Sequence, residues 1–133
     1  MIIDFEGEPA RTLSERRLKR SPLRDVAGMI RSFHYAAYNA LFLDTSLRAK
    51  DKPLLEPWAD LWYHYVSGIF LHSYLETCGD VPFIPHEKGE LETLFQAFLL
   101  DKAIYELGYE LNNRPDWIII PVRGVQCILK SGI

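Results

Sequence analysis

Apolar residues recur at every third or fourth position along most of the chain, which is the spacing of amphipathic helices. The first such segment follows Ser21 and Pro22, which suit the N-cap and the first position of a helix. It ends before the polar loop 50–53. Its expected buried stripe comprises Leu23, Val26, Ala27, Ile30, Phe33, Ala37, Tyr38 and Leu41. The pattern predicts a long helix with one face in the core.

A second helix is predicted from about Pro57 to Thr77, and Gly79 and Pro82 mark its end. Its expected buried stripe comprises Trp58, Leu61, Trp62, Tyr65, Val66 and Ile69. We therefore expect Trp58, Trp62 and Tyr65 in the core rather than around a ligand.

A third helix is predicted from about Lys88 to Asn112, before Pro115. Its expected buried stripe comprises Leu91, Leu94, Phe95, Phe98, Leu99, Leu100, Ile104, Leu107 and Leu111. After the apolar segment 117–120, Pro121 opens a final short helix to about Leu129. The chain is thus expected to be mainly α-helical.

The one exception to the helical pattern is the start of the chain. The apolar run 1–3 is followed by the polar turn 4–9, as in a short strand that ends in a loop. A lone strand has no partner for its backbone hydrogen bonds, and no second strand is evident. We expect its partner in sequence upstream of this chain.

Size and charge narrow the class of protein. The 133 residues are enough for one compact domain, and the net charge of −3 gives no pull toward nucleic acid or an anionic membrane. No apolar run approaches the roughly 18 residues of a membrane span, and residues 1–6 do not resemble a signal peptide. Cys78 and Cys127 fit no metal-ligand spacing and are expected to be reduced thiols. We expect a cytoplasmic protein.

The opening motif carries candidate metal chemistry. Asp4 follows the predicted strand directly, and Mg²⁺ in nucleotide sites is held by one or two carboxylates plus phosphates. In protein kinases the Asp of an Asp-Phe-Gly sequence has this role, whereas here Glu6 stands between Phe5 and Gly7. On the local pattern alone, an aspartate that caps a turn is the more common explanation.

A longer match distinguishes these alternatives. The segments that carry it are IDFEGEP (3–9), RSPLRDVAGM (20–29), RSF (31–33) and YELGYELNNRPDW (105–117). With the basic stretch between the first two, they resemble the maltokinase family, kinase-like enzymes related to the aminoglycoside phosphotransferases. The resemblance spans essentially the whole chain. One departure is His34, where we expect an acidic residue.

The resemblance implies a fold and a reaction. The fold would be the C-terminal helical lobe of a protein-kinase-like enzyme, with residues 1–133 forming a partial domain. The reaction would be phosphorylation of maltose by ATP and Mg²⁺ to maltose 1-phosphate, for α-glucan synthesis. The family's catalytic Asp lies in a His-Gly-Asp segment, which this chain lacks, so the N-terminal lobe and the catalytic base are expected upstream. On its own this chain is expected to be inactive.

The resemblance also suggests roles for particular residues. Asp4 would hold Mg²⁺, and Glu6 and Glu8 could contact the metal or the sugar. On the third helix Lys102, Tyr105, Glu106 and Tyr109 share one face. Tyrosine rings stack on sugar rings and Lys and Glu give directional hydrogen bonds, so we expect Lys102, Tyr105 and Tyr109 to bind maltose. The alternative is an ordinary helix surface with a Lys–Glu pair.

Other functions stay open at this level. A kinase for a different sugar, a helical binding module without chemistry, and a domain that docks trehalose synthase are the alternatives; in the family the synthase is fused to or paired with the kinase. The basic stretch 11–24 could contact phosphate or be a solvated surface. The spacing of His64, His72 and His86 favours no metal site.

Overall fold

The computed structural model describes residues 12–131, and within them it is helical, with no strand. The predicted strand 1–3 and the motif 4–9 lie outside the described residues. The helices are α1 (Leu13–Arg17), α2 (Leu23–Phe42), α3 (Lys52–Cys78), α4 (Lys88–Asn113) and α5 (Ile119–Ser131), with the 3-10 turn η1 (Pro115–Trp117) before α5. The prediction of a mainly helical chain is confirmed.

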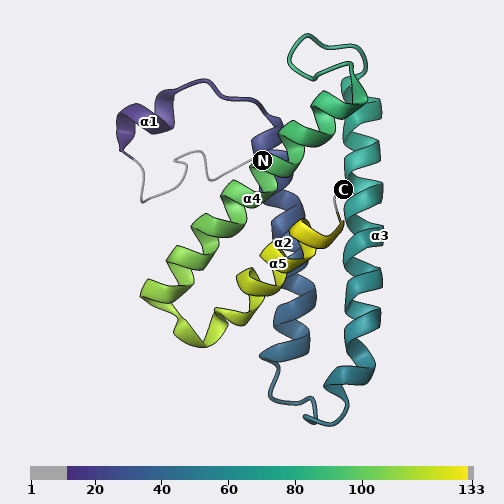
Figure 1. The fold of residues 1–133 in the computed structure, drawn as a ribbon, viewed down its shortest axis with the longest axis vertical. Helices are drawn as coiled ribbons and strands as arrows, with labels where there is room; N and C mark the ends of the chain where they lie inside the picture. Colours follow the sequence, from purple (N-terminus) through teal and green to yellow (C-terminus); the bar gives the residue numbers. More distant parts are fainter. Residues whose placement is uncertain (1–11, 132–133) are drawn as a thin grey trace, which may run out of the picture.

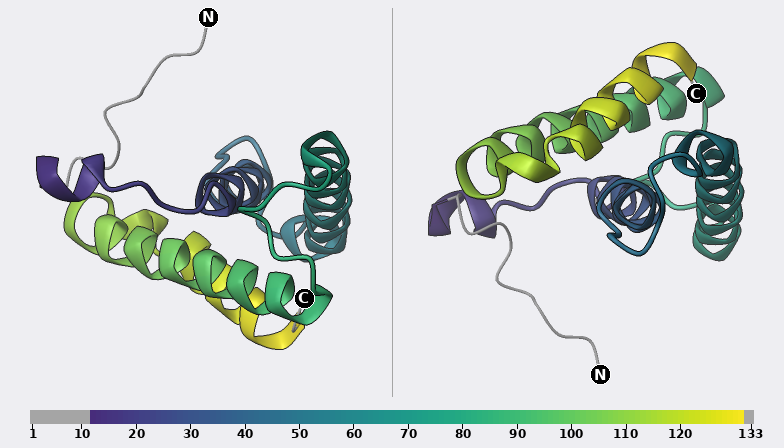
Figure 2. Two further views of the ribbon diagram at one scale, coloured as in Figure 1. Left: turned by 90° about the horizontal axis from the view of Figure 1, so that it is seen from above. Right: turned by 90° about the horizontal axis from the view of Figure 1, so that it is seen from below.

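The helices form two crossed layers. Helices α2 and α3 make an antiparallel hairpin, and α4 and α5 lie side by side across one face of it (Figures 1 and 2). Helix α2 is central, because it packs against α3, α4 and α5. Helix α1 stands apart from this bundle and has no buried residue. It is held locally by a capping box, in which Thr12 and Glu15 each accept a hydrogen bond from the other's backbone N–H.

The apolar stripe predicted for α2 is the core side of that helix. Leu23 and Ala27 are fully buried, and Ile30 packs with them against Phe95 and Leu99 of α4. A second, smaller cluster consists of Tyr38, Leu41 and Ile120. Helix α2 starts one residue later than predicted, and the Ser21 hydroxyl accepts a hydrogen bond from the backbone N–H of Leu23. The same face of α2 also carries two buried polar residues, Arg31 and His34.

The buried stripe predicted for α3 is wrong. Trp58, Leu61, Trp62, Tyr65 and Ile69 are all exposed, with Trp58 at 68% and Tyr65 at 69%. The face toward the core carries Tyr63 and Ser67, followed by partly buried Phe70 and Tyr74. Apolar residues occur all around α3, so periodicity alone could not select the face that packs on α2.

Helix α3 also begins earlier than predicted. Its first residue is Lys52, and Pro57 lies inside it. The start is held from outside the helix, because the Lys52 amine donates to the carbonyl of Phe42 at 2.6 Å. At the other end, the C-cap Gly79 adopts a φ of 59°, which favours glycine, and its N–H donates to the carbonyl of Leu75.

The stripe predicted for α4 is correct only in its first half. Phe95 and Leu99 are buried, whereas Ile104 and Leu111 are exposed at 55% and 54%. Past Leu99 the face toward α2 and α5 continues through Ala103 to Glu110, which is buried. The core side of each helix thus carries a buried charged residue, Arg31 on α2 and Glu110 on α4.

Candidate binding groove between α2 and α4

An open groove of about 470 Å³ lies where the second half of α4 faces α2. We call it the α2–α4 groove. It is lined by Ser32, Tyr35, Lys102, Tyr105, Glu106, Tyr109, Glu110 and Arg114. Its lining combines phenol rings, carboxylates and cationic groups, so it suits a polar ligand that also has apolar surface.

The residues predicted to bind sugar do lie together. Lys102, Tyr105 and Tyr109 all line the groove, with Glu106 between them. Their spacing on one helix explains this, because residues three and four apart share a face. The Lys102 amine lies 5.0 Å from the centre of the Tyr105 ring, a cation–π distance. A sugar that stacks on this ring would either displace the amine or use the opposite face.

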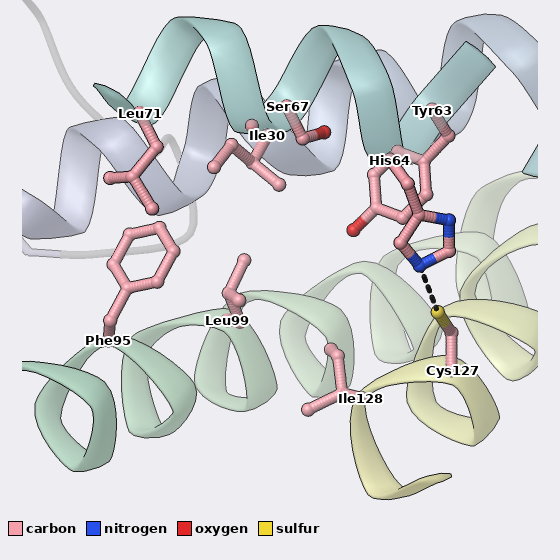
Figure 3. Close-up of a pocket in the computed structure, with 10 residues that line it drawn as sticks. Ile30, Tyr63, His64, Ser67, Leu71, Phe95, Leu99, Cys127 and Ile128 are labelled. Carbon is pink, nitrogen blue, oxygen red and sulfur yellow. Dashed lines mark hydrogen bonds between the residues drawn. The ribbon is translucent and has the colours of Figure 1, made fainter. Parts of the chain in front are cut away.

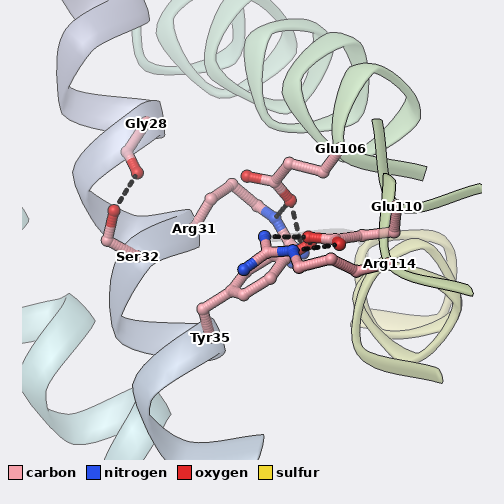
Figure 4. Close-up of polar contacts among 7 residues, drawn as sticks. All are labelled: Gly28, Arg31, Ser32, Tyr35, Glu106, Glu110 and Arg114. Atoms are coloured by element: carbon pink, nitrogen blue, oxygen red, sulfur yellow. Dashed lines mark hydrogen bonds and ion pairs between the residues drawn. The ribbon is translucent and has the colours of Figure 1, made fainter. Parts of the chain in front are cut away.

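Glu106, which lines the groove, forms an ion pair with Arg31 and so joins α4 to α2. Arg31 Nε donates to Glu106 Oε2 at 2.9 Å, and Nη2 of the same guanidinium lies 2.8 Å from that oxygen (Figure 4). The Arg31 side chain is 1% exposed and that of Glu106 is 12% exposed. Charges buried this deeply are stable only when paired, so each residue holds the other in place.

A second carboxylate is held from two sides. Tyr35 donates to Glu110 Oε1 at 3.1 Å, and Arg114 donates to both carboxylate oxygens of Glu110 at 2.9 and 2.7 Å (Figure 4). The bidentate geometry fixes the orientation of the Arg114 guanidinium. That guanidinium also lies 4.2 Å from the centre of the Trp117 ring and 5.6 Å from that of Tyr109. Arg114 therefore links the groove to η1.

The Tyr35 phenol stays protonated. Burial raises its pKa above the ordinary value of a tyrosine, and the charges of Glu106 and Glu110 raise it further. The nearby Arg31 opposes this only in part. Tyr35 is therefore a permanent hydrogen-bond donor to Glu110, which keeps the carboxylate oriented.

His34, one turn from Arg31 on α2, is buried away from water. Its ring stacks on Tyr38 with centroids 4.3 Å apart and meets the edge of Tyr63 at 5.1 Å. Neither ring nitrogen has a hydrogen-bond partner among the described residues. Burial, with the charge of Arg31, lowers its pKa to about 3. His34 is thus a neutral core residue rather than a proton donor or acceptor at neutral pH.

The other residues that the sequence suggested for metal or phosphate binding lie in the opening motif and in the basic stretch 11–24. Asp4, Glu6 and Glu8 lie outside the described residues. In the basic stretch, Arg24 pairs with Asp101 of α4 at 3.1 Å, whereas Lys19 and Arg20 are exposed.

Across residues 12–131, no group of three His, Cys, Asp or Glu side chains is placed to hold a metal ion. Within the same part of the chain, no helix combines the length and apolar character needed to cross a bilayer.

Sequence reasoning missed four residues of the groove. Glu110 of α4 and Arg114, the C-cap of that helix, are four residues apart, so their ion pair could have been predicted from spacing. Ser32 and Tyr35 come from α2, and only the packing of α2 against α4 brings them to Lys102 and Tyr105.

A search against protein-family models found no match for this chain.

Proposed function

We propose that the α2–α4 groove binds maltose and that this chain is the sugar-binding helical part of an ATP-dependent kinase that forms maltose 1-phosphate. The observation that carries the proposal is the meeting of Lys102, Tyr105 and Tyr109 with two oriented carboxylates in one groove. The resemblance of segments 3–9 and 105–117 to maltokinases supplies the reaction.

The groove has the size and chemistry that a disaccharide needs. Its volume of about 470 Å³ falls within the roughly 300–1,000 Å³ of small-molecule sites. Sugar rings place their C–H faces on aromatic rings, which Tyr105 and Tyr109 offer. Sugar hydroxyls donate to carboxylates such as Glu106 and accept from cations such as Lys102. Because Glu106 is already held by Arg31, its position is set before any ligand binds.

Mg²⁺ and ATP enter the proposal through the resemblance alone. Asp4 would hold the metal, which would neutralise charge on the transferred phosphoryl group. Asp4→Asn in the kinase that contains this chain should remove most turnover with maltose and leave maltose binding unchanged. Full activity of that variant at ordinary Mg²⁺ concentration would remove Asp4 from the proposal without touching the groove.

Steady-state kinetics of that kinase test the sugar site. Tyr105→Ala should raise the KM for maltose at least tenfold and leave the KM for ATP within about twofold, because Tyr105 lines the groove. Ile104→Ala is the matched control, since Ile104 neighbours Tyr105 on α4 but is exposed and not part of the groove lining. Equal effects of Tyr105→Ala on both substrates would contradict the sugar site.

The exposed face of α3 favours a second candidate, a module that docks a protein rather than a sugar. Trp58, Leu61, Trp62 and Tyr65 are all exposed and share one face of α3 by their three-four spacing. Trp58 and Trp62 also line a shallow hollow with Leu47 and Leu55. Such surfaces commonly serve protein contacts. The partner implied by the resemblance is trehalose synthase. Capture of the synthase by this chain, lost in Trp58→Glu and kept in Tyr105→Ala, would favour docking through α3.

A further inference from the structure

A separate apolar cavity of about 200 Å³ lies in the middle of the bundle, between α2, α3, α4 and α5. Its apolar walls come from Ile30, Leu71, Phe95, Leu99 and Ile128, one or two from each helix (Figure 3). A dry cavity of about 150 Å³ with such walls takes a benzene molecule. This cavity therefore suits an apolar group of about six to eight carbons.

The cavity lining also includes a buried hydroxyl, that of Ser67, without a hydrogen-bond partner among the described residues. Ser67 of α3 lines it, is 9% exposed, and has a buried Oγ that makes no hydrogen bond among the described residues. A serine inside a helix usually donates to the carbonyl one turn earlier. A buried hydroxyl without a hydrogen bond is unfavourable, because it has given up its bonds to water. Ser67 is therefore available to a polar atom of a ligand in the cavity.

At the rim of the cavity a thiol faces a histidine. Cys127 Sγ of α5 lies 3.9 Å from His64 Nε2 of α3, and both residues line the cavity (Figure 3). His64 Nδ1 is 2.8 Å from the backbone carbonyl of Asp60. A carbonyl only accepts, so Nδ1 carries the proton and Nε2 offers its lone pair to the thiol. This is the order of a nucleophile, its base, and a group that orients the base.

We propose that Cys127 is a nucleophilic thiol that accepts a short apolar acyl group from an acyl thioester, with the acyl chain in the cavity. His64 Nε2 takes the proton of the Cys127 thiol as Sγ attacks the thioester carbonyl carbon. The new S–C bond forms, the bond to the departing sulfur breaks, and the proton passes from His64 to the departing thiolate. The exchange leaves one thioester and one thiol, without oxidation or reduction.

Accessibility supports the same assignment. His64 is exposed and Cys127 is half-buried, so a thioester can reach the sulfur from solvent while its chain enters the cavity. Cys78 provides a comparison within the same molecule, because it is also half-buried but does not line the cavity. The cavity is a separate site from the α2–α4 groove, because the two have no lining residue in common.

Acylation of the full chain by N-acetylcysteamine thioesters tests the proposal, with the modified cysteine identified by peptide mass spectrometry. We expect the hexanoyl thioester to label Cys127 at least ten times faster than the acetyl thioester, and at least ten times faster than it labels Cys78. His64→Gln should slow hexanoylation of Cys127 at least tenfold at pH 7, and the exposed position of His64 keeps that change compatible with folding.

Three results would overturn the proposal. One is equal labelling of Cys78 and Cys127 by the hexanoyl thioester. Another is acetyl transfer as fast as hexanoyl transfer, which would remove the cavity from the account. The third is an unchanged rate in a folded His64→Gln protein, which would remove the base.

Discussion

The guanidinium of Arg31 lies against the backbone of α5 at Gly124, so close that a Cβ at position 124 would be 2.6 Å from Arg31 Cζ. Arg31 cannot move aside freely, because Glu106 holds it from α4. One side chain of α2 thereby ties α4 and α5 together and places the carboxylate that forms the wall of the α2–α4 groove.

Gly124→Ala should lower the free energy of unfolding by about 1–2 kcal/mol, since a side chain forced into a packed region costs typically 1–3 kcal/mol and the gain in helix propensity offsets part of it. Gly28→Ala on α2 is the control, because a Cβ there has nothing within 4 Å. That substitution should stabilise the protein by up to about 1 kcal/mol. Urea denaturation measures both, and equal effects would show that the Arg31–Gly124 contact is not tight.

The ion pairs Arg31–Glu106 and Arg24–Asp101, which both join α2 to α4, should differ in their contribution to stability. Glu106→Gln leaves the Arg31 charge buried without its counter-charge, which costs about 3 kcal/mol or more. Asp101→Asn breaks the Arg24 pair, where the Asp101 side chain is 57% exposed, and should cost less than about 1 kcal/mol. The two variants remove the same charge from the same helix. Similar midpoints in urea would contradict the account of the buried pair.

His34 should make the protein sensitive to mild acid. Its pKa is about 3 in the folded chain, against an ordinary value of 6.5, because of burial and the charge of Arg31. Between these values the unfolded state binds the extra proton, so stability is fully present above pH 6.5 and falls as the pH drops toward 3. The slope for one proton is about 1.4 kcal/mol per pH unit.

His34→Phe should flatten that dependence, because an aromatic ring between Tyr38 and Tyr63 is kept and the proton acceptor is lost. Urea denaturation between pH 5 and 6.5 measures the two slopes in a range where most carboxylates stay ionised. Parallel slopes for the wild type and His34→Phe would show that His34 takes up no proton on unfolding.

The corrected face of α3 leads to a fourth prediction. Trp58 is 68% exposed and Tyr63 is 7% exposed in the main core cluster. Trp58→Ala should change the free energy of unfolding by less than about 0.5 kcal/mol, as surface substitutions do. Tyr63→Ala should cost about 3–5 kcal/mol, as for other large buried rings. Thermal unfolding of the two variants decides between this face and the stripe expected from sequence, which gives the reverse order.

The sequence was sufficient to predict a helix and its buried face where the apolar residues are confined to one side of that helix. The three-four spacing of Leu23, Ala27 and Ile30 predicted both the existence of α2 and its buried face. It failed on α3, where Trp58 and Tyr63 are both aromatic and only the packing of α2 determines which one is buried. It failed again on α4, because Glu110 is buried through partners on α2 and at the end of its own helix.

The candidate sites show the same limit. Lys102, Tyr105 and Tyr109 could be grouped from sequence because they lie on one helix. His64 and Cys127 are 63 residues apart on different helices, so no spacing rule could pair them. Contacts between helices depend on crossing geometry, which the pattern along a single helix does not contain.

Titration of this chain with maltose, followed by two-dimensional amide NMR, shows whether the sugar binds in the α2–α4 groove. Maltose should cause amide shifts that saturate at millimolar concentration and concentrate between Lys102 and Arg114 and on α2 around Tyr35. They should be lost in Tyr105→Ala and kept in Ile104→Ala. An absence of shifts in the wild type, or shifts confined to α3, would contradict a sugar site in the α2–α4 groove.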